Sequence, residues 1–306
     1  MHPVRALAGV VLVAVAVACA PTAPPDDRGA GETAPSGGAA GTPTTGAATT
    51  PPGDDPGDGG ASPADRPQGD ALTDGESGAD AGLTPVDDLA GVGANGRAML
   101  RGDRGRLVVE VDVQEGLEPS QEAIDHLLAT LRQQVDKPGG VELAGGNTFS
   151  SDRTQWTAAD LRDVGAAQRS TSSGDDVVSL YVLYVRGGFV SDGEETRAIG
   201  VAHRASELAV FPDRWSGLGD LIGSDRRIER AVLVHELGHL FGLVELTYDS
   251  DHDRQDPDHP GHSSDRSSVM HYAVETTLVG QVFNGPPPDT FTAADRDDLA
   301  ALREGR

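Results

Sequence analysis

The sequence predicts an α+β domain in which a mixed β-sheet carries helices. Short apolar and β-branched stretches alternate with segments in which apolar residues recur every three or four positions. A helical segment that is apolar almost throughout, yet contains two histidines, follows the last of these stretches. This strand–helix–strand order is typical of a sheet with helices packed on it.

Strands are expected where β-branched and apolar residues run together or alternate with polar ones. They cover residues 106–113, 141–143, 177–185, 198–202 and 207–211. The third stretch, VVSLYVLYV, is a continuous apolar run, which is typical of a buried central strand.

Helices are expected over residues 119–135, 157–167, 228–244 and 293–303. Side-chain oxygens just before a helix can accept hydrogen bonds from its first turn. The expected N-caps are Ser120, Thr157, Ser224 or Asp225, and Thr292.

Residues 1–19 are interpreted as an export signal. A short polar start precedes an apolar run that is too short to cross a bilayer as a stable helix. The small residues before Cys19, the one cysteine of the chain, resemble the lipobox of bacterial lipoproteins, in which the cysteine is acylated. We therefore expect an extracytoplasmic protein that a lipid on Cys19 anchors to the bacterial cell membrane. An ordinary secretory signal, which predicts a secreted protein, is the alternative.

Composition separates residues 20–97 from the rest of the chain. Pro, Gly, Ala, Thr, Ser and Asp dominate there, so the segment buries too little apolar surface to offset the entropy lost on ordering. We expect a disordered acidic tether there and a folded domain over residues 98–306. The formal net charge of −25 argues against a nucleic-acid partner, because binding to phosphates needs a basic surface.

The expected helix over residues 228–244 contains candidate metal ligands and a candidate general base. His235 and His239 lie one turn apart on one helical face, close enough to hold a single ion. Two imidazoles and the Glu236 carboxylate would be costly to bury in an apolar helix unless something satisfied them. Neutral imidazoles suit Zn²⁺, and Glu236 can take a proton from water at that ion. The pattern predicts one catalytic zinc with Glu236 as its general base.

A third zinc ligand has to follow this helix, because a catalytic site usually has three protein ligands and an open position. The candidates are Glu245, Asp249, His252, His259 and His262. Aspartates are also frequent over residues 249–258, where an oxygen-rich cluster could bind Ca²⁺. Their spacing is not that of an EF-hand, because Arg254 stands where the turn glycine belongs.

The strings HELGHLFG and SVMHY, residues 235–242 and 268–272, resemble the metzincin clan of zinc peptidases, which includes matrixins and archaemetzincins. The resemblance implies a twisted, mostly parallel sheet with an active-site helix, a methionine-bearing turn beneath the metal and a C-terminal helix. It also implies that residues 198–202 form the upper edge strand, on which an extended substrate lies.

In matrixins and archaemetzincins the third histidine ligand precedes the turn methionine by eight residues, as His262 precedes Met270. The resemblance therefore implies that His262 is the third ligand and that Met270 forms the apolar floor of the site. The clan's usual position for the third ligand, three residues after the glycine, is occupied by Glu245, which remains a candidate. His259 and His252 remain candidates for the third ligand as well.

These features predict a zinc-dependent endopeptidase whose substrate is a polypeptide. By resemblance to astacin-like metzincins, Tyr272 would reach the zinc and steady the oxyanion. Two competing hypotheses concern different classes of protein, namely a non-catalytic surface domain that binds zinc or a partner, and a zinc amidase acting on cell-wall components. Glu236 argues against the first, because a purely structural site needs no base.

Overall fold

A computed structural model of the chain describes residues 83–191, 193–217, 225–244, 247–248, 250–283 and 285–306. Several predictions made from the sequence lie outside these residues. They concern the export signal with Cys19, the tether up to residue 82, Ser224 as a cap, and Glu245 and Asp249 as ligands.

A six-stranded sheet with the strand order β2-β1-β5-β9-β8 forms the centre of the domain. Its parallel strands are β1 (Arg106–Gln114), β2 (Val141–Leu143), β3 (Thr148–Phe149), which pairs with the last residues of β1, β5 (Val177–Tyr184) and β9 (Glu207–Val210). β8 (Gly200–Arg204) lies at one edge and runs antiparallel to β9. The prediction of a mixed, mostly parallel sheet is confirmed.

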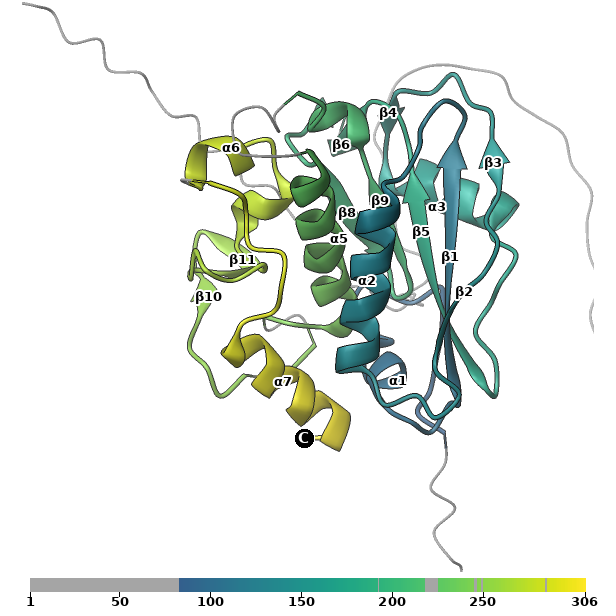
Figure 1. The fold of residues 1–306 in the computed structure, drawn as a ribbon, viewed down its shortest axis with the longest axis vertical. Coiled ribbons are helices and arrows are strands. Elements are labelled where there is room, and N and C mark those ends of the chain that lie inside the picture. The colour runs from purple at the N-terminus through teal and green to yellow at the C-terminus, as the bar shows by residue number, and fades with distance from the viewer. Residues whose placement is uncertain (1–82, 192, 218–224, 245–246, 249, 284) are drawn as a thin grey trace, which may run out of the picture. The chain divides into compact units, whose positions relative to one another are not determined.

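Helices cover both faces of this sheet (Figure 1). α2 (Gln121–Gln134) and α5 (Asp225–Phe241) pack side by side on one face, and α3 (Ala158–Gln168) covers the other. The C-terminal helix α7 (Ala293–Glu304), which the sequence predicted, packs against α1 (Gly96–Leu100). Among the described residues, no helix is both long and apolar enough to cross a membrane.

The alternation of residues along the strands divides the buried side chains between the two faces. On β1, Leu107 and Val109 join the core beneath α2 and α5. Glu110 and Asp112 point to the α3 face, where Asp112 accepts a hydrogen bond from the Tyr181 hydroxyl at 2.7 Å. β5 is buried along its length after its first residue, as expected of a central strand with both faces covered.

Local sequence sets the start of α3 and α7. Thr157 and Asp160 form a reciprocal capping box at α3, and Thr292 and Asp295 form another at α7. Ser120 precedes α2 as predicted, but its side chain makes no capping hydrogen bond. Its backbone N–H donates to the Glu229 carboxylate of α5 at 3.0 Å, so a tertiary contact holds the residue that precedes α2.

The remaining elements are short, and the sequence did not predict them because so few residues carry little periodicity. They are β4 (Gln155–Trp156), β6 (Gly188–Ser191) and β7 (Glu194–Glu195) in a small second sheet, the hairpin of β10 (Gln255–Asp256) and β11 (His259–Ser263), the 3₁₀ helices η1 (Pro212–Arg214) and η2 (Tyr272–Glu275), and α6 (Val279–Val282).

The edge strand begins later than predicted. It was expected over residues 198–202 but runs from Gly200 to Arg204. Ala198 forms an isolated bridge with Thr276, and the Ile199 N–H donates to the Glu275 carbonyl at 2.7 Å. The residues just before β8 are therefore paired with the last residue of η2 and the residue after it.

The folded part begins earlier than predicted. Residue 98 was expected as its first residue, but the preceding segment is already held on the α3 face. The Asp88 carboxylate accepts hydrogen bonds from the Ser173 N–H and the Ser206 hydroxyl, both at 2.8 Å, and pairs with Arg169 at 3.2 Å. Composition did not reveal this segment because few side chains hold it, among them Asp88 with its several partners and the valines Val86 and Val92, which pack on the core.

Candidate metal centre

α5 is enclosed by the sheet, α2 and the turn around Met270, which explains its apolar sequence. Gly238 lets the helix approach this turn, because a Cβ at that position would lie 2.2 Å from the Met270 sulfur. Gly200 does the same for β8, since its Cβ would lie 2.6 Å from a carboxylate oxygen of Glu236. The two glycines allow the strand and the turn to close around the polar part of the helix.

Four buried side chains converge at this place. His235 and His239 come from α5, His262 comes from β11, and Glu275 is the last residue of η2. One ligand atom from each lies within 4.8 Å of those of the other three. This is the one such group of histidine, cysteine, aspartate or glutamate found in the described part of the chain. The structure thus brings together the three histidines singled out from the sequence and adds a carboxylate to them.

The distances in this group suit a small divalent cation. The Nε2 atoms of His235 and His239 are 3.0 Å apart. The Glu275 carboxylate lies with Oε1 at 3.0 Å from His262 Nε2, and with Oε2 at 3.5 Å from His235 Nε2 and 3.9 Å from His239 Nε2. Ligands around a tetrahedral zinc lie roughly 3.4 Å apart, because Zn–N bonds are about 2.0–2.1 Å long.

The His235 ring is oriented by a backbone carbonyl. Its Nδ1 lies 2.6 Å from the Val269 oxygen. A carbonyl oxygen can only accept, so Nδ1 carries the proton and Nε2 presents its lone pair to the group. Second contacts of this kind fix the tautomer of metal-binding histidines.

His262 reaches the group because the chain between it and Met270 forms a closed turn. The Ser263 N–H donates to the Met270 carbonyl at 2.8 Å, and the Met270 N–H donates to the Ser268 hydroxyl at 3.0 Å. Met270 itself is fully buried beneath the helix. The spacing of eight residues between His262 and Met270 is the length of this turn.

Several buried polar atoms at the centre lack a hydrogen bond. They are both carboxylate oxygens of Glu236 and the Nδ1 atoms of His239 and His262. Buried polar groups are almost always satisfied, and an unsatisfied set is commonly explained by an ion or water. A divalent cation would take the converging lone pairs, so the donor set of three imidazoles and one carboxylate fits zinc.

The electrostatics of the group follow from burial and mutual contact. Burial, and then the nearby Glu275 carboxylate, raise the pKa of Glu236 well above its usual value. Burial, and then His235 and His262, lower the pKa of His239 well below its usual value, which keeps that ring neutral. Burial alone would lower the pKa of His262, but the Glu275 carboxylate beside it raises that pKa overall.

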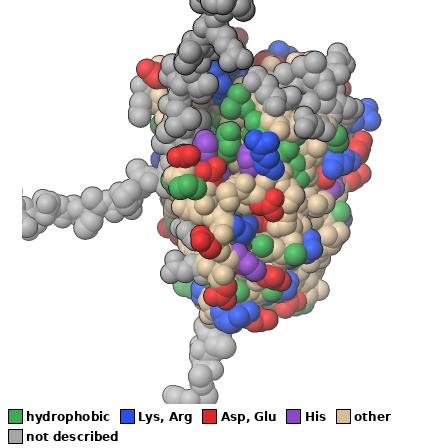
Figure 2. Space-filling view, turned by 90° about the vertical axis from the view of Figure 1, so that its left-hand side faces the viewer, with side chains coloured by type: hydrophobic (Ala, Val, Ile, Leu, Met, Phe, Trp, Pro, Cys, Tyr) green, Lys and Arg blue, Asp and Glu red, His purple; other side chains and the backbone are tan. Residues whose placement is uncertain are grey.

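Two other predicted ligand candidates, His252 and His259, are among the described residues and lie outside the group. His252 is 40% exposed at its side chain and pairs with Asp297 at 3.5 Å. His259 pairs with Asp256 at 2.9 Å, and its ring stacks on Tyr272 with a centroid distance of 3.6 Å. Neither histidine belongs to the converging group. Figure 2 shows one face of the molecule, on which histidine side chains come to the surface at separate points.

Nothing in the described residues supports a calcium site in the acidic loop. Arg254, which stands in the middle of this loop, forms ion pairs with Asp295 and Asp298 of α7. The Asp256 carboxylate is held by His259. The loop is therefore fastened by protein ion pairs, and its described aspartates do not form an oxygen cage.

Glu275 was missed from the sequence, although a signal was present. It stands in the stretch AVETTLVG, where it is the one charged side chain among apolar and small residues. A lone carboxylate in such a stretch is unusual, because buried glutamates are rare unless they are paired. The same reasoning singled out Glu236 on α5.

Comparisons with known proteins find similarity only among solved structures. No family model and no curated protein matches the sequence. The archaemetzincin of Methanopyrus kandleri is similar with a TM-score of 0.43 and 18% identity, over 67% of this chain and 98% of that one. The archaemetzincin of Archaeoglobus fulgidus, in complex with malonate, gives 0.36 and 12%, over 63% and 99%. A zinc-dependent peptidase of Methanocorpusculum labreanum gives 0.39 and 16%, over 62% and 99%. At such scores the chain is assigned to no family, and its function has to be inferred from the site itself.

Proposed function

We propose that this protein is a zinc-dependent peptidase that hydrolyses peptide bonds with an activated water. One observation carries the proposal. Glu236 is fully buried, neither of its carboxylate oxygens has a hydrogen bond, and it lies in the same helical turn as two of the three converging imidazoles. A carboxylate left unsatisfied beside a metal-binding group is costly for stability, which argues for a role in chemistry.

The reaction follows from these positions. Zinc, when bound, would supply a Lewis acid for the scissile carbonyl and make water acidic enough to lose a proton near neutral pH. Glu236 takes that proton on a carboxylate oxygen as the water oxygen bonds to the carbonyl carbon. It then gives the proton to the leaving amine nitrogen as the C–N bond breaks.

The substrate class is proposed to be a polypeptide that is cut within its length. β8 is the edge strand of the central sheet, and Gly200 at its start lies against Glu236. An extended chain can add to such an edge by backbone hydrogen bonds, which demand little of its sequence. Tyr272 as a partner of the oxyanion stays a prediction.

The location is proposed from the sequence. The apolar run before Cys19 and the small residues next to it support export, with a lipid on Cys19 as the membrane anchor or with release of a secreted form. The acidic net charge supports a protein without a nucleic-acid partner.

A second candidate function is a non-catalytic zinc-binding domain, and one observation favours it. Glu275 adds a fourth protein side chain to the three imidazoles, and four protein ligands are typical of structural zinc sites. The peptidase needs Glu236 for hydrolysis, whereas a non-catalytic zinc-binding domain hydrolyses no peptide with or without it.

Hydrolysis of casein and of quenched-fluorescent peptides by the wild type and by Glu236→Gln tests the proposal. We expect zinc content to be unchanged and hydrolysis to fall by roughly 10²–10⁴-fold, the usual contribution of a general base. Glu229→Gln is the matched control, because Glu229 is a buried carboxylate on the same helix that accepts hydrogen bonds from Ser120 and Tyr184. Zinc-loaded wild type that hydrolyses no faster than Glu236→Gln would favour the non-catalytic domain, and hydrolysis of peptidoglycan fragments alone would indicate an amidase.

A further inference from the structure

We propose that Glu275 is a displaceable fourth zinc ligand that closes the site at rest, so that the peptidase is latent until this carboxylate withdraws. The inference rests on the proposed function, since it concerns the same zinc site. It assigns a regulatory role to a residue that a metal site with three histidines and a base does not require.

The position of Glu275 is that of a ligand. Its two carboxylate oxygens lie 3.0 to 3.9 Å from the Nε2 atoms of all three imidazoles. Neighbouring ligands of a tetrahedral zinc are roughly 3.4 Å apart. The carboxylate therefore stands at a fourth corner around the point on which the imidazoles converge.

The charge on the buried Glu275 carboxylate also indicates that a cation binds beside it. Its side chain is 8% exposed, and the ion pairs it makes in the described part of the chain are all with His235, His239 and His262. In the contrasting case of Asp295, which is fully buried, a protein guanidinium from Arg254 supplies the positive charge. One divalent cation would balance the two buried carboxylates of the centre, Glu236 and Glu275.

A site with four protein ligands conflicts with catalysis, and displacement of one ligand removes the conflict. Catalytic zinc keeps one position open for water and substrate. The imidazoles of His235 and His239 are held by the rigid helix α5, whereas Glu275 ends a single turn of 3₁₀ helix. Glu275 is therefore more easily withdrawn than the two imidazoles of α5.

The backbone of Glu275 links it to the edge of the sheet. Its carbonyl accepts from the Ile199 N–H at 2.7 Å, and the Thr277 N–H donates to the Arg197 carbonyl at 2.9 Å. These pairs lie directly before β8, the strand proposed to receive the substrate. A chain added along β8 would approach the residues that hold Glu275, and a change of the Glu275 side-chain rotamer would free the position without breaking the backbone pairs.

Binding of azide to the cobalt-loaded full-length chain tests this proposal. Co²⁺ replaces zinc and absorbs visible light, and its spectrum changes when azide enters an open position. We expect azide to leave the spectrum of the wild type unchanged and to change that of Glu275→Ala and Glu275→Gln. Glu194→Gln is the charge-matched control, because Glu194 is exposed, and it should behave as the wild type. Zinc should dissociate more easily from Glu275→Ala by roughly 10–100-fold.

The outcomes separate this proposal from the proposed function. A wild-type spectrum that responds to azide as strongly as that of the variants overturns the role of Glu275 and leaves the peptidase intact. Variants that bind cobalt but still exclude azide overturn it as well. If azide enters only the variants, yet no zinc-loaded form cleaves a peptide, Glu275 is a ligand of a site that is not a peptidase. Glu275→Gln, which keeps the size of the side chain, carries the test if Glu275→Ala does not fold.

Discussion

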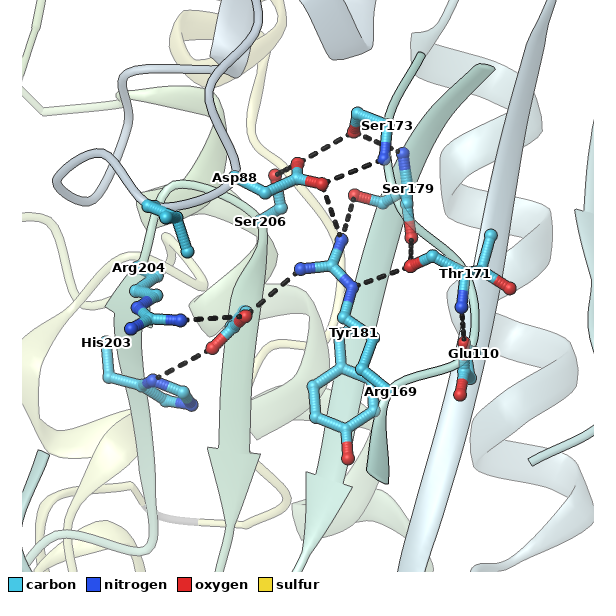
Figure 3. A network of polar contacts seen from close by, with 12 residues as sticks. Asp88, Glu110, Arg169, Thr171, Ser173, Ser179, Tyr181, His203, Arg204 and Ser206 are labelled. Carbon is cyan, nitrogen blue, oxygen red and sulfur yellow. Dashed lines mark hydrogen bonds and ion pairs between the residues drawn. The ribbon is translucent and has the colours of Figure 1, made fainter. Parts of the chain in front are cut away.

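A polar cluster is buried on each face of the central sheet, and the two clusters differ in the groups that neutralise their carboxylates. On the α3 face Arg169 lies between two carboxylates (Figure 3). Its guanidinium pairs with Glu207 at 3.0 Å and with Asp88 at 3.2 Å, and its Nε donates to the Thr171 carbonyl at 2.8 Å. On the α5 face the Glu275 carboxylate meets three imidazoles and no guanidinium or ammonium group among the described residues.

This difference indicates that the cluster on the α3 face stabilises the fold and that the cluster on the α5 face binds a ligand. Asp88 and Glu207 are both paired with Arg169, and Glu110 accepts from the N–H groups of Ser170 and Thr171 at 2.8 and 2.7 Å. The second oxygen of Glu207 has no hydrogen bond and lies 3.6 Å from Nδ1 of His203. The group of His235, His239, His262 and Glu275 on the α5 face has no guanidinium partner among the described residues and can bind a cation. A satisfied network stabilises one arrangement of the chain, whereas an unsatisfied one marks a place for a ligand.

The largest stability effect is expected on the α3 face. Arg169→Ala removes the counter-charge of Asp88 and Glu207, and breaking such a buried pair costs about 3–5 kcal/mol. Urea unfolding measures this loss, and zinc content should stay unchanged. Arg204→Ala is the matched control, because Arg204 lies 3.6 Å from the same Glu207 oxygen and is more exposed, so it should cost no more than about 1 kcal/mol. If Arg169→Ala also released the metal, the two clusters would not be independent.

A smaller effect, on metal binding, is expected on the α5 face. His262→Ala removes a ligand and should weaken zinc binding by more than about 100-fold, beyond the usual effect of losing a supporting contact. His252→Ala and His259→Ala should retain zinc, because these side chains pair with aspartates outside the group. Competition with a chelator of known affinity measures all three. Zinc retained by His262→Ala would move the third ligand to another residue.

The smallest effect concerns the one buried histidine of the α3 face, His203, which breaks the pattern because neither ring nitrogen has a hydrogen bond. Burial, and then the guanidiniums of Arg162 and Arg204, lower the pKa of His203 to about 3. As the pH falls below about 6.5, His203 binds a proton in the unfolded chain but not in the folded chain, because its pKa in the folded chain is lower. The contribution of neutral His203 to the free energy of unfolding is therefore complete above about pH 6.5. It is lost towards pH 3 by about 1.4 kcal/mol per pH unit.

Urea unfolding at pH 6.5 and 5.5 with excess zinc measures this slope. His203→Gln should show a shallower dependence on pH than the wild type. His252→Gln is the control, since that side chain is 40% exposed. Equal slopes in the wild type and His203→Gln would mean that a partner already satisfies His203, for which the Glu207 carboxylate, 3.6 Å from Nδ1, is a candidate.

Local patterns predicted much of this fold correctly. The strands β1, β2 and β5 and the capping boxes of α3 and α7 match the expectations from alternation and from Thr157 and Thr292. Contacts between distant segments account for the errors. Residues 198 and 199 pair with Thr276 and Glu275 at the end of η2, and Asp88 helps to hold a segment whose composition is that of a tether.

The sequence by itself determined that two imidazoles one helical turn apart, with a carboxylate between them, lie in an apolar helix. Such spacing is fixed by 3.6 residues per turn and needs no knowledge of the rest of the chain. Only the tertiary structure decided that Glu275 joins them and that Arg169 neutralises Asp88 and Glu207. These partners are far apart in sequence, so their meeting depends on how the turn at Met270 and the edges of the sheet bring separate segments together.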